Sequence, residues 1–297
     1  MQDGVVKPIR YAVVASLVAT LMVTTMSNAV AKDVHSTIPQ SAPCGVVTKT
    51  TTRHVVWIVL ENLGYSVVGS RAAPYFNSLA SRCSLATNYL AVSHPSLPNY
   101  IALTSGSTQG IADDNEPSSH PLAVANIFSE LKGSWRAYDE SMPAPCDRVT
   151  SGSYAARHNP AVYYTNLPSC SRDDLPLTAP LDLSAAFTMI TPNVCNDMHS
   201  CPVTTGDIWL KKYVATIIAS SQYQSRSLVL FVTFDENVES ATNRVPTIVV
   251  GPSVPRGAHI DTLFTHYSLL RSTEALLHVP VLGGARSASS MIQAFHL

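Results

Sequence analysis

Nearly continuous apolar runs, rich in β-branched residues, occupy residues 54–60 and 227–234 of the chain. A strand shows this pattern when both of its faces are covered, as in the centre of a parallel sheet. Shorter runs at 135–138, 187–192 and 245–250 predict three more strands. We therefore expect a buried sheet that includes these five segments.

Segments with apolar side chains at helical spacing alternate with the predicted strands. The clearest is 205–221, where Trp209, Tyr213 and Ile217 fall on one face of a helix. We also expect a helix directly after Ser96 and helices at 74–81, 122–131 and 265–277. Strands that alternate with helices predict an α/β fold, with a mostly parallel central sheet sandwiched by helices.

One long stretch lacks either pattern. Residues 142–183 contain many Pro, Ser and Asn residues and show little periodicity. Long irregular excursions in compact domains are often functional. We therefore expect this excursion to supply the walls of a ligand pocket.

The beginning of the chain has the pattern of a signal peptide. Lys7 and Arg10 precede an apolar run at 11–26, and the small residues Ala29-Val30-Ala31 follow. This order predicts cleavage after Ala31 and export to the periplasm or the medium. A membrane anchor is the alternative, but the run is short for a span and is interrupted by Thr and Ser. We expect 1–31 to be the signal peptide and 32–297 a single domain without a stable membrane anchor.

The net charge argues against one class of partner, and the cysteines predict disulfides. The net charge is −1 and no basic stripe is visible, which argues against nucleic acid as a partner. Six cysteines lie in the exported part, where they can form up to three disulfides. Cys195 and Cys201 are close enough in sequence to close a small loop, whereas the other four can pair in more than one way. We expect a monomer.

A serine just ahead of a predicted helix is the first candidate for chemistry. Pro98 suits the first turn of a helix, which places Ser96 near the N-cap. Free N–H groups and the positive end of the helix dipole stabilise an anion at such a position. Serine is also a common N-cap in any protein, so this segment alone does not decide between the two roles.

Polar residues end both of the long buried strands. Glu61 and Asn62 follow the first, and Asp235 and Glu236 follow the second. Ligands of α/β sheets bind beyond the carboxyl ends of the strands, so these four side chains are expected to converge. Their oxygens suit a divalent cation such as Ca²⁺, Mg²⁺, Mn²⁺ or Zn²⁺, with Ser96 as a further ligand. Solvated polar caps on the strands are the alternative.

Three histidines form a second group of candidates. His199 lies with Asp197 inside the Cys195–Cys201 loop, His158 lies in the irregular excursion, and His266 begins the last helix. Histidine suits metal ligation, protonation of a leaving alkoxide or contact with a phosphate. His94, two residues before Ser96, is a weaker candidate for a supporting role.

Eight motifs in series resemble the bacterial phosphoesterase family of the alkaline-phosphatase-like superfamily. That family contains secreted acid phosphatases and phospholipases C, and the shorter acid phosphatases are the most similar. The motifs are Glu61-Asn62, His94-Pro95-Ser96-Leu97-Pro98-Asn99-Tyr100, Ser134 to Pro143, Arg157-His158-Asn159-Pro160, Pro192 to His199, Gly206 to Leu210, Asp235-Glu236 and Thr265-His266-Tyr267.

The resemblance implies a covalent mechanism. Ser96 would attack phosphorus to form a phosphoserine, which water would then hydrolyse, and Asn99 would bind a phosphoryl oxygen. The family's metal-site pattern would be matched by Glu61, Asn62, Asp235 and Glu236. The other side of the site would be filled by Asp197, His158, His199 and His266.

Two departures from the family pattern affect this expectation. Leu63-Gly64 stands where many relatives have Arg-Ser, so an arginine contribution from that loop is absent. The spacing of Asp197 and His199 differs from the Asp-x-x-x-His of two-zinc members, which leaves the number of metal ions open.

Several activities are compatible with this pattern to different degrees. A sulfatase is disfavoured, because Tyr100 replaces the arginine that the sulfatase nucleophile motif requires. A phospholipase C-type phosphodiesterase and a non-catalytic protein that binds phosphorylated ligands stay open. We expect a secreted acid phosphatase that hydrolyses phosphate monoesters on small molecules or lipid headgroups. The resemblance to short relatives places phosphoinositides among the candidate substrates.

Overall fold

The computed structural model describes residues 1–5, 7–8, 37–178, 180–238 and 242–297. Residues 37–297 form one compact unit, and residues 1–36 form a separate one. Most of the predicted signal peptide therefore lies outside the described residues, and so does its cleavage site. In the described part of the chain, no helix is both long and apolar enough to cross a membrane.

A nine-stranded sheet runs through the compact unit in the order β4-β3-β5-β1-β6-β7-β2-β8, with β9 also paired to β2. Its strands are β1 (His54–Leu60), β2 (Ser84–Leu90), β3 (Trp135–Asp139), β4 (Asp174–Pro176), β5 (Phe187–Thr191), β6 (Leu228–Phe234), β7 (Arg244–Val250), β8 (Ala258–Ile260) and β9 (Phe264–Thr265). The two long apolar runs, β1 and β6, are neighbours near its centre and fully buried over most of their length.

The sheet is mostly parallel, as predicted. β1 runs parallel to both β5 and β6, and Trp57 is opposite Phe231 in the register of the β1–β6 pair. β7 runs antiparallel to both of its neighbours, β6 and β2. The carboxyl ends of β1 and β6 therefore meet at one edge.

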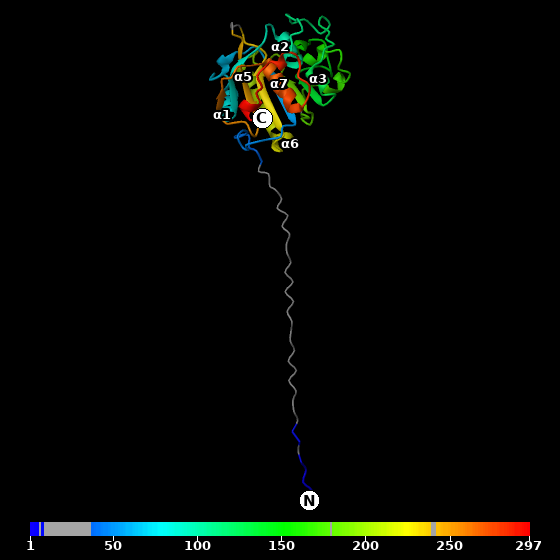
Figure 1. Ribbon diagram of the computed structural model, residues 1–297, viewed down its shortest axis with the longest axis vertical. Helices are drawn as coiled ribbons and strands as arrows, with labels where there is room; N and C mark the ends of the chain where they lie inside the picture. Colours follow the sequence, from blue (N-terminus) through cyan, green and yellow to red (C-terminus); the bar gives the residue numbers. More distant parts are fainter. Residues whose placement is uncertain (6, 9–36, 179, 239–241) are drawn as a thin grey trace. The chain divides into compact units, whose positions relative to one another are not determined.

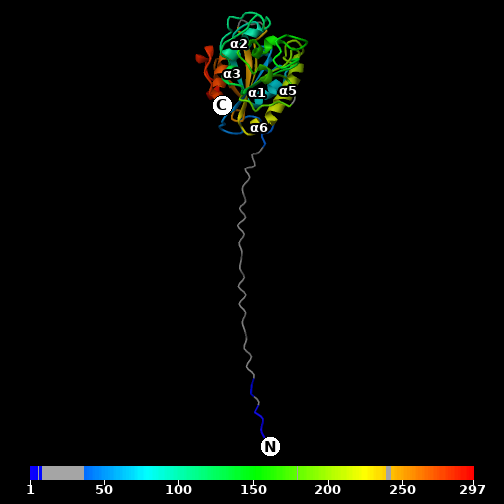
Figure 2. The same ribbon diagram turned by 90° about the vertical axis from the view of Figure 1, so that its right-hand side faces the viewer.

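Helices cover both faces of this sheet (Figures 1 and 2). Trp57 on β1 donates its Nε1–H to Thr273 on one side, while Phe234 on β6 packs against Phe76 on the other. Alternate residues of a strand face opposite sides, so these contacts belong to opposite faces. The first face carries α7 (His266–Leu277) packed with α2 (Ser96–Ser105), and the second carries α1 (Pro74–Arg82) packed with α5 (Val203–Ala219).

Two predictions of local structure are wrong. The expected helix at 122–131 is only the four-residue α3 (Ile127–Glu130), which begins with a capping box formed by Asn126 and Ser129. Leu122 instead forms an isolated parallel bridge with Tyr164. The second difference is β2, which the apolar pattern did not predict.

The excursion at 142–183 is irregular for most of its length but contributes β4 to the sheet edge. It also holds the short helices α4 (Cys170–Asp173), η2 (Ala156–His158) and η3 (Pro160–Tyr163). The remaining short helices of the described residues are α6 (Ser221–Gln224), α8 (Ile292–Phe295), η1 (Tyr65–Val67) and η4 (Gly283–Arg286).

All six cysteines are paired. The predicted Cys195–Cys201 disulfide is present, and the other two join Cys44 to Cys83 and Cys146 to Cys170.

Candidate active site

The carboxyl ends of β1 and β6 bring Glu61 and Asp235 together, as their positions in the sequence predicted. The N–H of Asn62 donates to Asp235 Oδ1 over 2.9 Å, which links the two strand ends. Asn62 has a φ of 47°, a left-handed conformation that asparagine tolerates better than most residues. The N–H of Glu61 donates to the carbonyl of Asp197 over 2.9 Å, so the disulfide loop joins the same edge.

Ser96 is the first residue of α2 and is 3 % exposed. Sequence reasoning placed it at the N-cap, but Pro95 has that position. Asn99 holds the preceding turn, because its Oδ1 accepts the N–H groups of Val92 and Ser93 at 3.1 and 3.0 Å. Its Nδ2 donates to the carbonyls of Ser93 and Pro95. These contacts favour a role for Asn99 in positioning Ser96.

Four side chains contact the carboxylate of Glu61. Ser96 Oγ donates to Oε2 over 3.0 Å, and Asn62 Nδ2 donates to the same oxygen over 3.2 Å. Tyr100 donates its hydroxyl to Oε1 over 2.7 Å. His158 Nε2 lies 3.3 Å from Oε1 but without hydrogen-bond geometry, and its ring stacks on that of Tyr100.

Glu236 faces a different set of partners. Its Oε2 lies 2.7 Å from His94 Nδ1 and accepts a hydrogen bond from Asn99 Nδ2 over 3.3 Å. These contacts tie Glu236 to the segment that carries Ser96. A cavity of about 390 Å³ adjoins this pair and is lined by Asn62, His94, Pro95, His199, Glu236, Asn237 and Val238.

His266 lies behind Asp235 and both of its ring nitrogens have partners. Nε2 contacts the carbonyl of Asp235 at 2.6 Å, and Nδ1 lies 3.1 Å from the hydroxyl of Tyr89. The side chain is fully buried. This geometry makes His266 a support for the backbone of Asp235.

The disulfide loop places Asp197 beside the strand ends and His199 at the cavity. Asp197 Oδ1 accepts the N–H of His199 over 2.9 Å, and Asn62 Nδ2 lies 3.4 Å from His199 Nδ1. Gly206 on α5 allows the loop to approach, because a Cβ there would lie 2.7 Å from the carbonyl oxygen of Asn196. His199 is exposed, whereas Asp197 is buried.

Burial and mutual repulsion raise the pKa values of the clustered carboxyls. Burial raises the pKa of Glu61 well above its usual value, and the charges of Asp235 and Asp197 raise it further. Burial likewise raises the pKa of Asp235, and it raises the pKa of Asp197 to about 7. The pKa of Glu236 rises to about 8 through burial and the charge of Asp235.

The donor set fits a divalent cation. Asp235 Oδ2 and Asp197 Oδ2 are buried without a hydrogen-bond partner, as is His158 Nε2. Buried polar atoms are rarely left unpaired in native proteins, and carboxylate oxygens are ligands for hard cations. Among the described residues, Glu61, Asp197 and Asp235 form no ion pair with a lysine or arginine, so a cation would relieve their repulsion.

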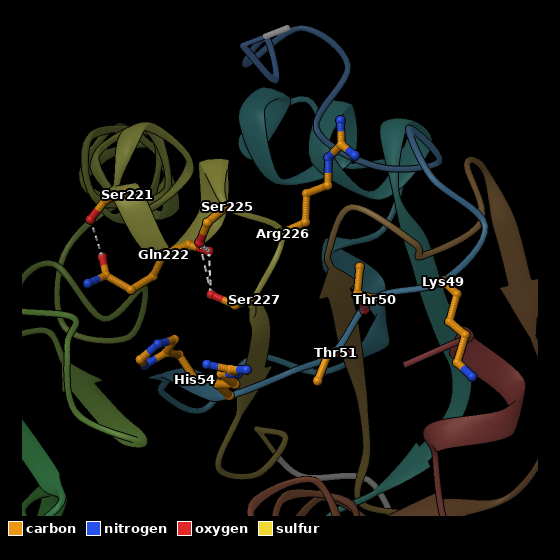
Figure 3. A pocket seen from close by; sticks show the side chains of 10 residues that line it. Lys49, Thr50, Thr51, His54, Ser221, Gln222, Ser225, Arg226 and Ser227 are labelled. Carbon is orange, nitrogen blue, oxygen red and sulfur yellow. Dashed lines mark hydrogen bonds between the residues drawn. The ribbon is translucent and has the colours of Figure 1, made fainter. Parts of the chain in front are cut away.

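Two other places in the described structure lack these properties. Cys146, Cys170 and Asp174 bring ligand-type atoms within 4.8 Å of one another, but the two sulfurs already form a disulfide. A cavity of about 590 Å³ lies where β1 and β6 begin, at the other edge of the sheet (Figure 3). In Figure 3 the side chains of Lys49 and Arg226 in its lining extend in different directions. Neither place contains a predicted site residue.

Sequence reasoning missed two side chains that organise the site. Tyr100 lies four residues after Ser96, a spacing that puts both on one face of α2 and that was available from the sequence. Tyr89 comes from β2, a strand that the apolar pattern did not predict, so nothing local marked its contact with His266.

Comparison with known proteins gives a consistent result. The model of the Phosphoesterase family matches residues 62–280. A phosphatidylinositol-3-phosphatase from Mycobacterium tuberculosis is 32% identical over 248 residues, which are 80% of this chain and 81% of that protein. An acid phosphatase from Aspergillus fumigatus is 30% identical over 302 residues, 91% of this chain but 66% of that protein.

Solved structures share the fold at low sequence identity. A protein of the alkaline phosphatase superfamily from Vibrio parahaemolyticus aligns with a TM-score of 0.55 at 11% identity, covering 84% of this chain and 74% of that one. The lipoteichoic acid synthase LtaP from Listeria monocytogenes aligns with a TM-score of 0.55 at 10% identity, covering 82% and 78%.

Proposed function

Because the chain belongs to the phosphoesterase family, enzymes that hydrolyse phosphoric esters, we propose that it is a secreted phosphomonoesterase that acts through a phosphoserine on Ser96. The observation that carries this proposal is the hydrogen bond from Ser96 Oγ to the buried carboxylate of Glu61, at the first residue of α2. A nucleophile there meets the positive end of the helix dipole, which stabilises the phosphoryl group.

Hydrolysis of the phosphate ester proceeds in two steps. Ser96 Oγ forms a bond to phosphorus while the bond between phosphorus and the ester oxygen breaks, and its own proton passes to Glu61 Oε2. Water then attacks the phosphorus and gives a proton back to the histidine that protonated the leaving oxygen. The bond between phosphorus and Oγ breaks, phosphate leaves, and Glu61 Oε2 returns its proton to Oγ. Tyr100 and Asn62 hold the Glu61 carboxylate in place throughout.

His199 is the residue that suits protonation of the leaving oxygen. It lines the cavity and is exposed, so its ring is accessible to a substrate. His158 is less suited, because burial lowers its pKa well below the usual value and keeps the ring neutral. His266 has both ring nitrogens engaged.

A divalent cation is expected at Glu61, Asp197 and Asp235, with Asn62, Ser96 and Glu236 as further candidate ligands. When bound, it would neutralise the repelling carboxylates and withdraw charge from the phosphoryl group. Its identity among Ca²⁺, Mg²⁺, Mn²⁺ and Zn²⁺ can be determined by adding each ion to chelated protein and measuring turnover. Full activity after chelation would argue against this site.

The test of the nucleophile is Ser96→Ala. The variant should lose turnover of p-nitrophenyl phosphate by at least about a thousandfold. Wild-type protein quenched at low pH after brief exposure to substrate should carry a phosphate on the peptide that contains Ser96. Turnover that survives the substitution, with no phosphopeptide in the wild type, would overturn the assignment.

We include phosphoinositides among the proposed substrates, because the mycobacterial relative bears the name phosphatidylinositol-3-phosphatase. A panel of p-nitrophenyl phosphate, p-nitrophenylphosphorylcholine and short-chain phosphatidylinositol 3-phosphate separates the alternatives. Cleavage of the diester alone would replace the monoesterase by a phospholipase C-type activity.

The proposal that the protein is secreted rests on the pattern at 1–31 and on the three disulfides, which form and persist in oxidising compartments. Expression of the full chain in a bacterial host, followed by N-terminal sequencing of the exported protein, tests it. A mature chain that begins at Lys32 is expected, and an uncleaved cytoplasmic chain would contradict it.

A further inference from the structure

Asp114 accepts a hydrogen bond from a backbone N–H next to the proposed nucleophile, Ser96. The N–H of Leu97, the second residue of α2, donates to Asp114 Oδ1 over 2.9 Å. The first N–H groups of a helix have no partner within the helix, and they are the donors that bind anions. Pro98 has no N–H at all, so Leu97 offers one of the few donors at this terminus. The carboxylate of Asp114 accepts a hydrogen bond from that donor.

The same aspartate is approached by an arginine. Arg157 Nε lies 3.8 Å from Asp114 Oδ2, which is an ion-pair distance but too long for a hydrogen bond. Within the described residues, the guanidinium of Arg157 makes no hydrogen bond, and its side chain is 31% exposed. Five N–H donors therefore stay available on a cation beside the helix terminus.

Arg157 also lies close to the other half of the site. It lies in η2, next to His158, and η2 packs against α2. The pair therefore lies beside the first turn of α2, with Asp114 in contact with the Leu97 N–H. Leu63-Gly64 follows Glu61-Asn62, so these positions supply no cation to the site.

We propose that Arg157 binds the phosphoryl group of the substrate. Asp114 occupies the Leu97 N–H until a phosphoryl oxygen displaces its carboxylate and binds that N–H instead. A phosphoryl group is an acceptor that matches both partners: one oxygen replaces Asp114 Oδ1 on the helix, and others take two N–H groups of the guanidinium. Asp114 opposes binding by like charge and keeps Arg157 near the site. This inference rests on the proposed function.

The test measures inhibition by inorganic phosphate and its calorimetric binding in the metal-loaded enzyme. Arg157→Met should weaken both by about tenfold or more, the loss expected for a hydrogen bond between charged groups. Arg157→Lys should recover part of the affinity, because a cation remains without the fork geometry.

Substitution of Asp114 should change phosphate affinity in the opposite direction. Asp114→Asn removes the charge but keeps an acceptor for Leu97, and Asp114→Ala also frees the N–H group. Both should tighten phosphate binding, by about threefold to tenfold, because a like charge beside the anion is gone. Phosphate affinity that is unchanged or weaker in both Asp114 variants would overturn the displacement.

Matched controls exclude general effects of charge. Arg148→Met removes an exposed arginine from the same excursion, and Asp113→Asn removes the neighbouring carboxylate, which contacts His120 instead of α2. Neither should change phosphate affinity by more than about twofold, since exposed charges are screened. Equal effects in controls and test variants would reject the roles of Arg157 and Asp114.

The inference and the proposed function fail in different ways. If wild-type protein does not hydrolyse any phosphate ester, the proposed function fails. If it does, and Ser96→Ala abolishes this, but Arg157→Met binds phosphate as wild type does, then the nucleophile stands and only the role of Arg157 is rejected. Thermal melting of each variant confirms that the protein measured is folded.

Discussion

Glu61 is the residue on which the other side chains of the site depend. Its Oε2 accepts hydrogen bonds from Ser96 and Asn62, while its Oε1 accepts one from Tyr100 and faces His158. The hydrogen bonds of Ser96 and Tyr100 lower the Glu61 pKa against the larger effect of burial. The ionised form therefore depends on these neighbours.

Tyr100→Phe is expected to reduce kcat about tenfold, because it removes a hydrogen bond to a buried charged group. The pKa of Glu61 should rise, so the acidic limb of the kcat profile should move to higher pH. The ring that stacks on His158 is kept, which preserves the packing. The measurement is kcat against pH, and an unshifted acidic limb would contradict the role of the hydroxyl.

Tyr164→Phe is the matched control for this change. Its hydroxyl lies 2.7 Å from Thr104 Oγ1 on the same helix and is equally buried, but it does not reach Glu61. The loss should appear as a lower melting temperature with an unchanged pH profile.

Individual site residues were predictable where position in the sheet determines them. Glu61 and Asp235 follow buried strands, and parallel strand ends must meet at one edge. The roles of Asn99 and His266 could not be predicted in this way. Asn99 mainly contacts backbone groups of the irregular segment just before α2. His266 contacts the backbone of Asp235 and the hydroxyl of Tyr89 on β2, which was not predicted.

At the scale of elements, the disulfide loop of residues 195–201 and helix α5 fit together through Gly206. A Cβ at Gly206 would lie 2.4 Å from Met198 Cγ and 2.7 Å from the Asn196 carbonyl oxygen. Met198 itself has a φ of 76°, so the loop has little freedom to adjust. The position of Asp197 therefore depends on the absence of a side chain on α5.

Gly206→Ala should displace the loop and reduce kcat by about tenfold to a hundredfold, the penalty of moving a catalytic group by a fraction of an ångström. Helix propensity alone would predict a more stable α5. Thr216→Ala, on the exposed face of α5, serves as the control. Kinetics of p-nitrophenyl phosphate hydrolysis decide the matter, and unchanged kcat in Gly206→Ala would show that Asp197 need not be held.

Elements were predictable where both faces of a strand are apolar, as in β1 and β6. β2 was not, because Thr87 and Asn88 interrupt its apolar pattern. These side chains donate to the carbonyls of Ile260 and Asp261, in and after β8, so tertiary contacts satisfy them. The helix expected at 122–131 fails for a related reason, since Leu122 pairs with Tyr164 from the excursion.

At the scale of the whole molecule, the buried carboxyls make stability depend on pH in an unusual direction. A carboxyl whose pKa is raised on folding stabilises the fold while protonated, and this contribution is lost as pH rises through the folded pKa. Asp197 and Glu236 have pKa values of about 7 and 8, so the loss of stability continues to neutral pH and above.

Metal-free protein should therefore melt at lower temperature as pH rises from about 5 to 8. A bound divalent cation competes with the protons for the same carboxylates and stabilises the folded state. The gain in melting temperature on adding the ion should thus be larger at pH 8 than at pH 5. Calorimetry with and without chelator tests this, and an equal gain at both pH values would count against carboxylate ligation.

A second buried pair contributes to the same trend away from the site. Adjacent strands β3 and β4 carry Asp139 and Asp174, and burial raises the pKa of both. Asn159 Nδ2 donates to Asp174 Oδ2 over 2.9 Å. Asp174→Asn keeps an acceptor for Asn159 and removes one ionisable group.

This variant should melt about 2–4 °C above wild type at pH 8, which corresponds to about 1 kcal/mol in a domain of this size. The difference should shrink toward pH 5, where the carboxyl is protonated. Asp261→Asn, at an exposed carboxyl, should show no such dependence. A constant offset across the pH range would indicate a packing effect instead.

The Cys195–Cys201 bridge makes the geometry of the site depend on the oxidation state of the chain. The bridge closes the loop that carries Asp197 and His199 beside the strand ends. We expect a chain with free thiols at these two positions to hold both side chains less firmly. Activity would then depend on oxidation of Cys195 and Cys201 as well as on folding of the chain. A chain in a reducing compartment would therefore hydrolyse phosphate esters more slowly than the oxidised chain.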